Sequence, residues 1–365
     1  MFEYLNSWYR RYFTDPQAAL LVVLLVIGFV IVFTMGKMLA PLIAAIIIAY
    51  LLEGPAQKIQ RLHGSRSLAV VIVFLLFMTF LALLLFGLLP ILSRQVSQFF
   101  QEVPYMIANG QELLLKLPQQ YPEIISEDAV WEVILAIKSG VSDLGQNVLS
   151  ISLASIPAII TVLVYLILVP VMIFFFLKDK EIIVSWLTRF LPAERKLITE
   201  IWQEMDGQIG NYIRGKSNEI LIIFAASLIL FRLMDLNYAS LLALVVGLSV
   251  LIPYIGAAVV TLPVALVAYF QWGLDSQFTW LMISYLILQF LDGNVLVPVL
   301  FSDAVNLHPI AIIVAILVFG GLWGFWGVFF AIPLATLVKA LINIWPTTAD
   351  YLQEASEATE ETVEV

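Results

Sequence analysis

The sequence predicts an all-α, polytopic membrane protein with two broken hairpin segments and an external helical segment. Of its 365 residues, 62% are hydrophobic and 12% are charged, and the mean hydropathy is +0.99. Soluble domains carry about 25% charged residues. Several apolar runs reach the roughly 20 residues that a helix needs to cross a bilayer, which a large soluble core would not require. We therefore expect most of the chain to lie in lipid.

The N-terminal region, residues 1–92, contains three apolar runs that we expect to be the first membrane spans. These runs are residues 18–35, 39–52 and 68–92. Arg10 and Arg11 precede the first run, and no small-residue cleavage site follows it, so we expect it to stay as a span rather than act as a secretory signal. The third run is long enough to cross a bilayer with some tilt.

The next segment, residues 93–150, is more polar and more acidic than its surroundings. Its charged residues include Glu102, Glu112, Glu123, Glu127, Asp128, Glu132 and Asp143, against Arg94, Lys116 and Lys138. Apolar residues at helical spacing from Val96 to Val103 indicate amphipathic helices. We expect an extracytoplasmic helical segment that packs on itself or on a neighbouring subunit. Residues 151–177 then predict a fourth span.

Residues 178–217 form a basic linker with an apolar stripe. The stripe consists of Leu197, Ile201, Met205 and Ile209. This helical spacing predicts an amphipathic helix lying beside the membrane. Lys and Arg accumulate on the cytoplasmic side of short loops, so we expect this linker and both termini inside and residues 93–149 outside. The acidic tail, residues 346–365, has no apolar periodicity, which predicts disorder.

The C-terminal membrane region, residues 218–345, combines two ordinary spans with two broken segments. The ordinary spans are residues 220–233 and 278–291. The first broken segment is interrupted at residues 253–256 and the second at residues 320–327, and each resumes with an apolar stretch that contains a proline. A matched pair of Gly/Pro-interrupted segments points to a transporter's substrate site, because broken helices expose backbone groups that bind a solute.

The predicted solute and ion pathway consists of these interruptions and the polar triplet that ends the sixth span. Its residues are Pro253, Tyr254, Gly256, Asp292, Asn294, Gly320, Gly321, Gly324 and Gly327. In a simpler interpretation, the glycines mark kinks or a tight helix crossing of the GxxxG type. The segments are either re-entrant hairpins that enter from opposite faces or fully spanning pairs, and arms of roughly 14–16 residues are short for spanning.

Two acidic residues are candidates for coupling transport to an ion gradient. Asp292 has no basic neighbour in sequence, and a charge in hydrocarbon is costly enough to imply a role or a partner. In the alternative, Asp292 caps a helix in interfacial water. Glu219 lies one turn from Lys216, so an interfacial ion pair is a sufficient explanation for it.

A set of short motifs occurs in the order typical of one known family. They are Tyr212–Gly215, Pro253–Ala257, Asp292–Pro298, Leu307–Pro309, Gly320–Gly327 and Ala331–Leu334. With these motifs the chain resembles the autoinducer-2 exporter family of permeases, PerM-type, over nearly its whole length. The resemblance implies a multi-pass protein of the bacterial inner membrane that moves small solutes, with members linked to a quorum-sensing signal or to sodium–proton exchange. The family often has Glu where this chain has Asp292.

Composition and motifs exclude several function classes. The chain has no cysteine and two histidines, too few for a thiolate or histidine metal centre. Its net charge of −9 argues against binding to nucleic acid. No P-loop, G-x-S-x-G or H-E-x-x-H motif occurs, so we expect neither an enzyme nor a bound cofactor or metal.

We therefore expect a secondary transporter or exporter of a small solute, driven by a proton or sodium gradient. Its partners would be the solute, the coupling ion, membrane lipid and further copies of the chain in a homo-oligomer. A passive channel built as an oligomer is the first alternative. A membrane scaffold or sensor with a partner-binding external domain is the second.

Overall fold

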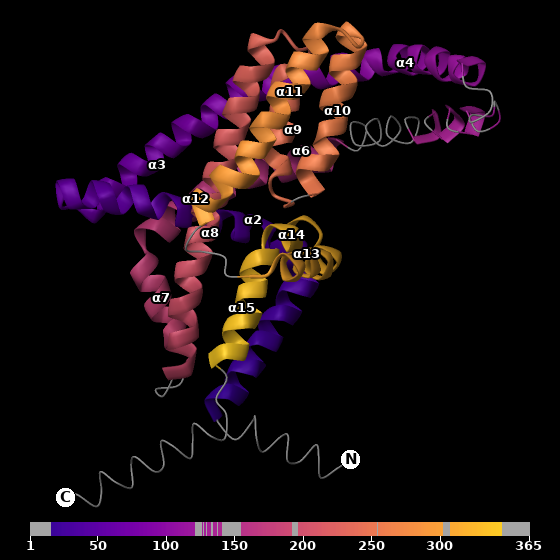
Figure 1. Ribbon diagram of the computed structural model, residues 1–365. Helices are drawn as coiled ribbons and strands as arrows, with labels where there is room; N and C mark the ends of the chain where they lie inside the picture. The colour runs from indigo at the N-terminus through magenta and orange to yellow at the C-terminus, as the bar shows by residue number, and fades with distance from the viewer. Residues whose placement is uncertain are drawn as a thin grey trace, which may run out of the picture. The chain divides into compact units, whose positions relative to one another are not determined.

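The computed structural model describes most of the chain, and all regular secondary structure in the described part is helical (Figure 1). The described residues are 16–120, 126, 128, 130–132, 134–136, 138–140, 155–191, 196–253, 255–301 and 307–344. Arg10, Arg11, Tyr254 and the predicted acidic tail lie outside them. The chain divides into two compact units that each collect separate stretches of sequence.

Unit 1 comprises Met1–Val70, Met172–Glu219 and Asn294–Val365. It contains α2 (Pro16–His63), the start of α3 (Arg66–Leu83), the end of α6 (Ser155–Lys178), α7 (Lys180–Thr188), the first part of α8 (Lys196–Leu233), α12 (Val297–Phe301), α13 (Pro309–Trp323), α14 (Phe325–Phe329) and α15 (Ala331–Ile344).

Unit 2 comprises Val71–Val171 and Ile220–Gly293. It contains the rest of α3, α6 and α8, together with η1 (Leu84–Leu88), α4 (Leu89–Gln120), α9 (Ala239–Ser249), α10 (Ile255–Trp272), α11 (Ser276–Leu291) and the start of η2 (Asp292–Leu296).

Five helical segments in the described part of the chain are long and apolar enough to cross a membrane. They are Met38–Leu62, Arg66–Lys116, Thr161–Lys178, Ile255–Trp272 and Ser276–Phe301. Many large apolar side chains on these helices are exposed, as expected where lipid rather than water is the solvent. The predicted class, a polytopic α-helical membrane protein, is confirmed.

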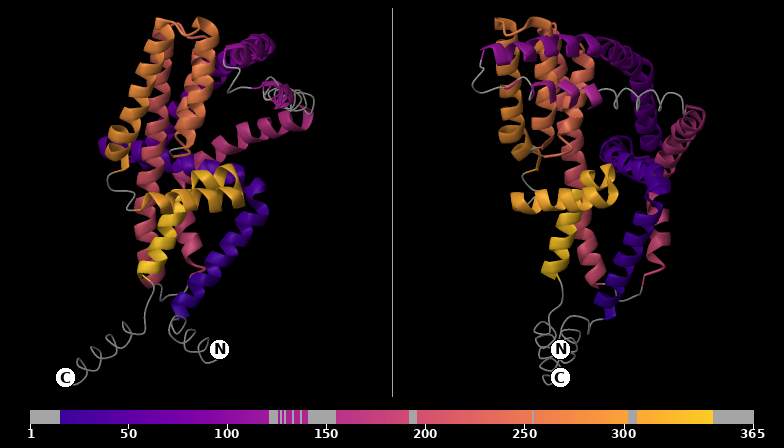
Figure 2. Two further views of the ribbon diagram at one scale, coloured as in Figure 1. Left: turned by 45° about the vertical axis from the view of Figure 1, so that its right-hand side comes forward. Right: turned by 90° about the vertical axis from the view of Figure 1, so that its right-hand side faces the viewer.

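The first two apolar runs form one helix rather than two separate ones. α2 continues through Gly36 and Lys37 for 48 residues, and Figure 2 shows that its two halves point in different directions. A lone glycine inside a helix costs only about 1 kcal/mol relative to alanine, so it does not end the helix without further turn residues.

The amphipathic stripe of the linker is covered by other helices of unit 1. Ile201 and Met205 of α8 are buried together with Leu21 of α2 and Ala340 of α15, and Ile209 packs against this cluster. An apolar stripe predicts a buried face but does not specify what covers it. In unit 1 the linker helix is therefore a structural support for α15.

The segment that begins at residue 93, which we expected to lie outside, is a direct continuation of the helix of the third apolar run. α3 passes through a π-helical turn, η1, into α4 without a break, and α4 is amphipathic as predicted. Gln95 of α4 accepts a hydrogen bond from the backbone N–H of Leu241 at 2.8 Å, and the rings of Phe99 and Tyr238 meet edge to face. The first part of α4 therefore packs on the start of α9.

Both broken segments are helical hairpins, but their arms are less alike than predicted. In the first hairpin α9 has 11 residues and α10 has 18, and α10 is long enough to cross a membrane. In the second, α13 has 15 residues and α15 has 14, with the short helix α14 between them. Pro263 lies inside α10 and does not interrupt it.

Candidate functional site

The first hairpin turns where Gly256 touches the backbone of the incoming helix. α9 ends at Ser249, and α10 begins at Ile255 after a tight turn in which the Gly256 N–H donates to the Ile252 carbonyl at 2.9 Å. Gly256 is buried, and a Cβ atom there would overlap the carbonyl group of Ser249. Only glycine allows this approach of two backbones.

The second hairpin has the same contact at Gly327. This glycine is buried, and a Cβ atom on it would overlap the carbonyl group of Phe319 near the end of α13. Gly324, which ends α13, adopts φ +58° and ψ −131°, a conformation that other residues rarely take. The two predicted interruptions therefore share one packing contact, in which a glycine lies against a backbone carbonyl of the preceding helix.

The remaining pathway glycines differ in their surroundings. A Cβ atom on Gly320 would lie 2.8 Å from Val328 Cγ2, so Gly320 packs within its own hairpin. Gly321 is exposed and has nothing within 4 Å of that position. The close-packing interpretation therefore applies to Gly320, while Gly321 is free of steric constraint. Pro253 is half-buried in the first turn.

Lys216 and Glu219 form a buried ion pair on α8. Lys216 Nζ and Glu219 Oε2 are 2.8 Å apart, and the side chains are 5% and 3% exposed. The pairing agrees with the sequence spacing, and both side chains are buried within the protein. Burying two charges carries a large desolvation cost that close geometry only partly offsets, so such pairs in membrane proteins usually serve a function.

The wall around this pair comes from α8, α12 and α14. Lys216 Nζ lies 5.4 Å from the ring centroid of Phe301, and a Cβ atom on Gly215 would lie 2.8 Å from Phe301 Cε1. The Tyr212 hydroxyl donates to the Phe329 carbonyl at 2.9 Å, and burial, followed by the Glu219 carboxylate, raises the pKa of that hydroxyl. Tyr212 therefore stays neutral and ties α8 to the second hairpin.

Asp292 lies within a helix and not at its end. α11 continues through the π-helical turn η2 into α12, so the predicted end of the sixth span at the Asp292–Asn294 triplet is wrong. A π-turn adds one residue to a helical turn without ending the helix. Asp292 is 8% exposed, whereas Asn294 is exposed. A buried carboxyl group within a spanning segment favours the functional interpretation over the helix cap.

A neutral polar cluster in unit 2 was not predicted. Tyr285 of α11 is fully buried, and its hydroxyl accepts a 2.7 Å hydrogen bond from Gln289 Nε2 and lies 3.5 Å from Thr261 Oγ1 on α10. Thr261 in turn donates to the Ala257 carbonyl at 2.7 Å. This cluster lies one to two turns from Gly256 along α10. Tyr285 and Gln289 lie one helical turn apart in an otherwise apolar span, and this spacing could have indicated the cluster from the sequence.

Comparison with known proteins identifies the family. The model of the AI-2E family transporter matches residues 20–347. The chain belongs to the AI-2E transporter family. The Escherichia coli (strain K12) member named "Putative permease PerM" is 49% identical over 346 residues, which cover 95% of this chain and 98% of that protein. "Putative transport protein YueF" of Bacillus subtilis is 28% identical over 321 residues and covers 86% of each.

This AI-2E family membership confirms the resemblance drawn from the motifs and supports a role in transport. The motif Tyr212–Gly215, which carried part of that resemblance, forms the wall of the buried ion pair. Lys216 directly follows that motif, and its spacing from Glu219 predicts the ion pair but not the burial of the pair. Phe301 was not singled out at all, because its role depends on packing between helices far apart in sequence.

Proposed function

We propose that this protein is a secondary transporter that exports a small solute across the bacterial inner membrane and is coupled to a proton or sodium gradient. The observation that carries the proposal is the buried Lys216–Glu219 pair beside the second hairpin. A scaffold would gain nothing from two buried charges, whereas a transporter uses titratable or ion-binding groups to link two states.

The two hairpins supply the proposed binding elements. Each brings the C-terminal end of one helix, with its carbonyl groups, close to the N-terminal end of the next, with its N–H groups. Such broken-helix turns bind ions and polar solutes in transporters without needing charged side chains. The solute and ion pathway would run by the turns at Pro253–Gly256 and Gly320–Gly327, with Asp292 and Asn294 as further contacts and Glu219 and Asp292 as coupling groups.

Reconstitution into vesicles tests this proposal. Vesicles that contain the purified protein would be loaded with a panel of small solutes. Efflux of each solute would then be followed with and without an imposed pH or sodium gradient. We expect saturable efflux that one gradient accelerates. Efflux that rises linearly with concentration and ignores both gradients would favour the passive channel. The absence of any flux over empty vesicles would favour the scaffold or sensor.

The proposed orientation places both termini and the linker, residues 178–217, in the cytoplasm. The chain has no natural cysteine, so single cysteines report one position each. Glu200→Cys in intact cells should resist an impermeant thiol reagent, and Lys116→Cys should react with it once the outer membrane is permeabilised. External labelling at position 200 would overturn the orientation.

Crosslinking in the membrane followed by mass measurement would test the proposed homo-oligomer.

A further inference from the structure

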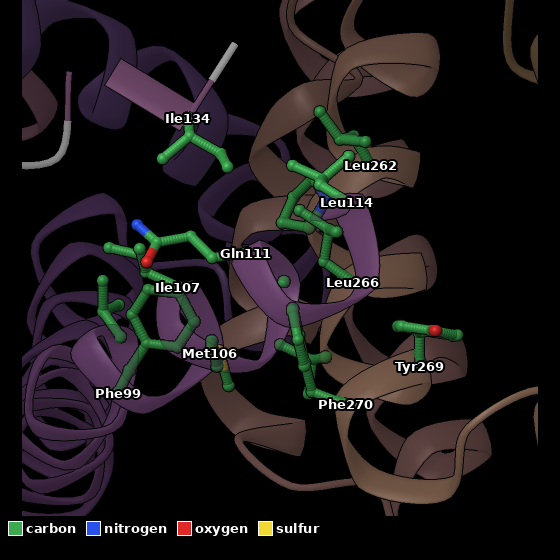
Figure 3. Close-up of a pocket in the computed structure, with 14 residues that line it drawn as sticks. Phe99, Met106, Ile107, Gln111, Leu114, Ile134, Leu262, Leu266, Tyr269 and Phe270 are labelled. Atoms are coloured by element: carbon green, nitrogen blue, oxygen red, sulfur yellow. The ribbon is translucent and has the colours of Figure 1, made fainter. Parts of the chain in front are cut away.

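Unit 2 contains a cavity of about 640 Å³ between α4 and α10, which none of the proposed pathway residues lines (Figure 3). Its lining comes from three stretches of chain. They are Phe99 to Leu114 on α4, Ile134, and Leu262 to Phe270 on α10. This volume lies within the roughly 300–1,000 Å³ typical of pockets that hold small ligands.

The chemistry of the lining selects an apolar guest with one polar group. Among the described residues that line the cavity, Gln111 and Tyr269 alone have polar side chains. The Gln111 Nε2 group is buried and has no hydrogen-bond partner among the described residues. A hydrophilic solute would lose its water without finding new partners, which is unfavourable. A guest with a long apolar body and one hydrogen-bond acceptor would satisfy both the walls and the amide.

Both long walls of the cavity belong to, or directly continue, helices that are apolar enough to span a membrane. α4 continues the third span without a break, and the continuous helix Arg66–Lys116 contains a stretch apolar enough to cross a membrane. Phe99 follows the end of the third apolar run, Leu92, by seven residues, which is about 10 Å of helix. The opposite wall, α10, is itself long and apolar enough to span. A molecule already dissolved in the bilayer therefore has the shortest route into the cavity.

We propose that this cavity binds one acyl chain of a glycerolipid from the adjacent leaflet, with Gln111 Nε2 donating to the ester carbonyl. A segment from a second copy of the chain fits less well, since each inserted residue brings a backbone donor and acceptor and the cavity offers one amide. Because α10 is an arm of the first hairpin, the bound lipid would act as a fixed part of that hairpin's support.

A photoreactive lipid tests the proposal in the full-length protein. The probe is phosphatidylethanolamine with a diazirine halfway along one ester-linked chain, in vesicles of phosphatidylethanolamine and phosphatidylglycerol. After illumination, mass spectrometry should locate the label on the cavity-lining stretches of α4 and α10. Gly110→Leu places a side chain in the cavity, because Gly110 lines it and a Cβ atom there would lie 3.9 Å from Phe270 Cζ, an ordinary van der Waals contact. It should lower this labelling about tenfold.

Two controls make the result specific. Gly87→Leu adds the same side chain at an exposed position with nothing within 4 Å, and should leave labelling unchanged. Gln111→Leu should lower labelling by the ester-linked probe and have no effect on an ether-linked probe, which lacks the carbonyl. The proposal would be overturned if Gly110→Leu left the labelling yield unchanged. It would also be overturned if Gln111→Leu lowered labelling by the ester-linked and ether-linked probes equally. Crosslinks from these positions to a second copy of the chain would overturn it as well.

Discussion

The two hairpins close by the same contact but are supported by different chemistry. In each, one glycine touches a carbonyl of the preceding helix, Gly256 against Ser249 and Gly327 against Phe319. The first hairpin is flanked by hydroxyl and amide groups around Tyr285, whereas the second is tied through Tyr212 to a helix that carries a buried ion pair. Similar backbone geometry is thus combined with neutral polar groups beside the first hairpin and with a charged pair beside the second.

This difference indicates a division of labour within the proposed transporter. Neutral hydroxyl and amide groups hold a fixed hydrogen-bond pattern over a wide pH range, because they do not titrate near neutrality. A buried ion pair has two arrangements, paired or opened by a proton or cation, and can therefore link a gradient to a conformational change. We expect the second hairpin to carry the coupling and the first to provide a stable surface.

The largest expected effect comes from opening the ion pair on one side. Lys216→Met leaves the Glu219 carboxylate buried without its cation, and should destabilise the protein by about 3–5 kcal/mol. The double variant Lys216→Met/Glu219→Leu removes both charges, so its thermal unfolding in detergent should return close to that of the wild type. Coupled flux should be lost in both variants.

An exposed pair provides the matched control for this experiment. Lys116 and Glu112 also form a 2.8 Å ion pair, but their side chains are 54% and 69% exposed. Lys116→Met should change neither the unfolding temperature nor the flux noticeably, since exposed pairs contribute little. Full gradient-driven flux in the folded double variant would contradict the coupling role of Lys216 and Glu219.

The second effect compares the two closing glycines. Gly256→Ala and Gly327→Ala each force a Cβ atom into a backbone carbonyl, which must move, so we expect a loss of at least about 1–3 kcal/mol, as in overpacked cores. Gly321→Ala is the control, because its site is open. Thermal unfolding of the three variants tests whether both glycines make the same close contact with a backbone carbonyl. If one glycine tolerates alanine as Gly321 does, the two hairpins do not close alike.

How far the sequence alone predicts this molecule depends on whether a feature is local. The helices, the position of both interruptions and the pairing of Lys216 with Glu219 follow from breakers and spacing within a few residues. The burial of that pair and the role of Phe301 arise from contacts between distant segments, which periodicity does not report. The helix through Asp292 was missed because a π-turn has no reliable sequence signature.

The third prediction concerns Asp292, which should matter to transport more than to folding. Asp292→Asn keeps the size and removes the charge, so membrane insertion and yield should be unchanged. Flux or its ion coupling should fall about tenfold, which corresponds to about 1.4 kcal/mol. Measuring flux in vesicles between pH 5 and 9 for both proteins provides the test. Equal flux at every pH would remove Asp292 from the mechanism.

The smallest expected effect comes from removing one hydroxyl group in each unit. Tyr285→Phe removes the acceptor of the Gln289 hydrogen bond, and Tyr212→Phe removes the donor to the Phe329 carbonyl. Each loss should cost about 0.5–1.5 kcal/mol in unfolding free energy, the usual net contribution of one hydrogen bond. If the second hairpin carries the coupling, Tyr212→Phe should also change the response of flux to the imposed gradient, while Tyr285→Phe leaves that response unaltered. The reverse pattern would assign the coupling to the first hairpin, and the charged groups of unit 1 would then be structural.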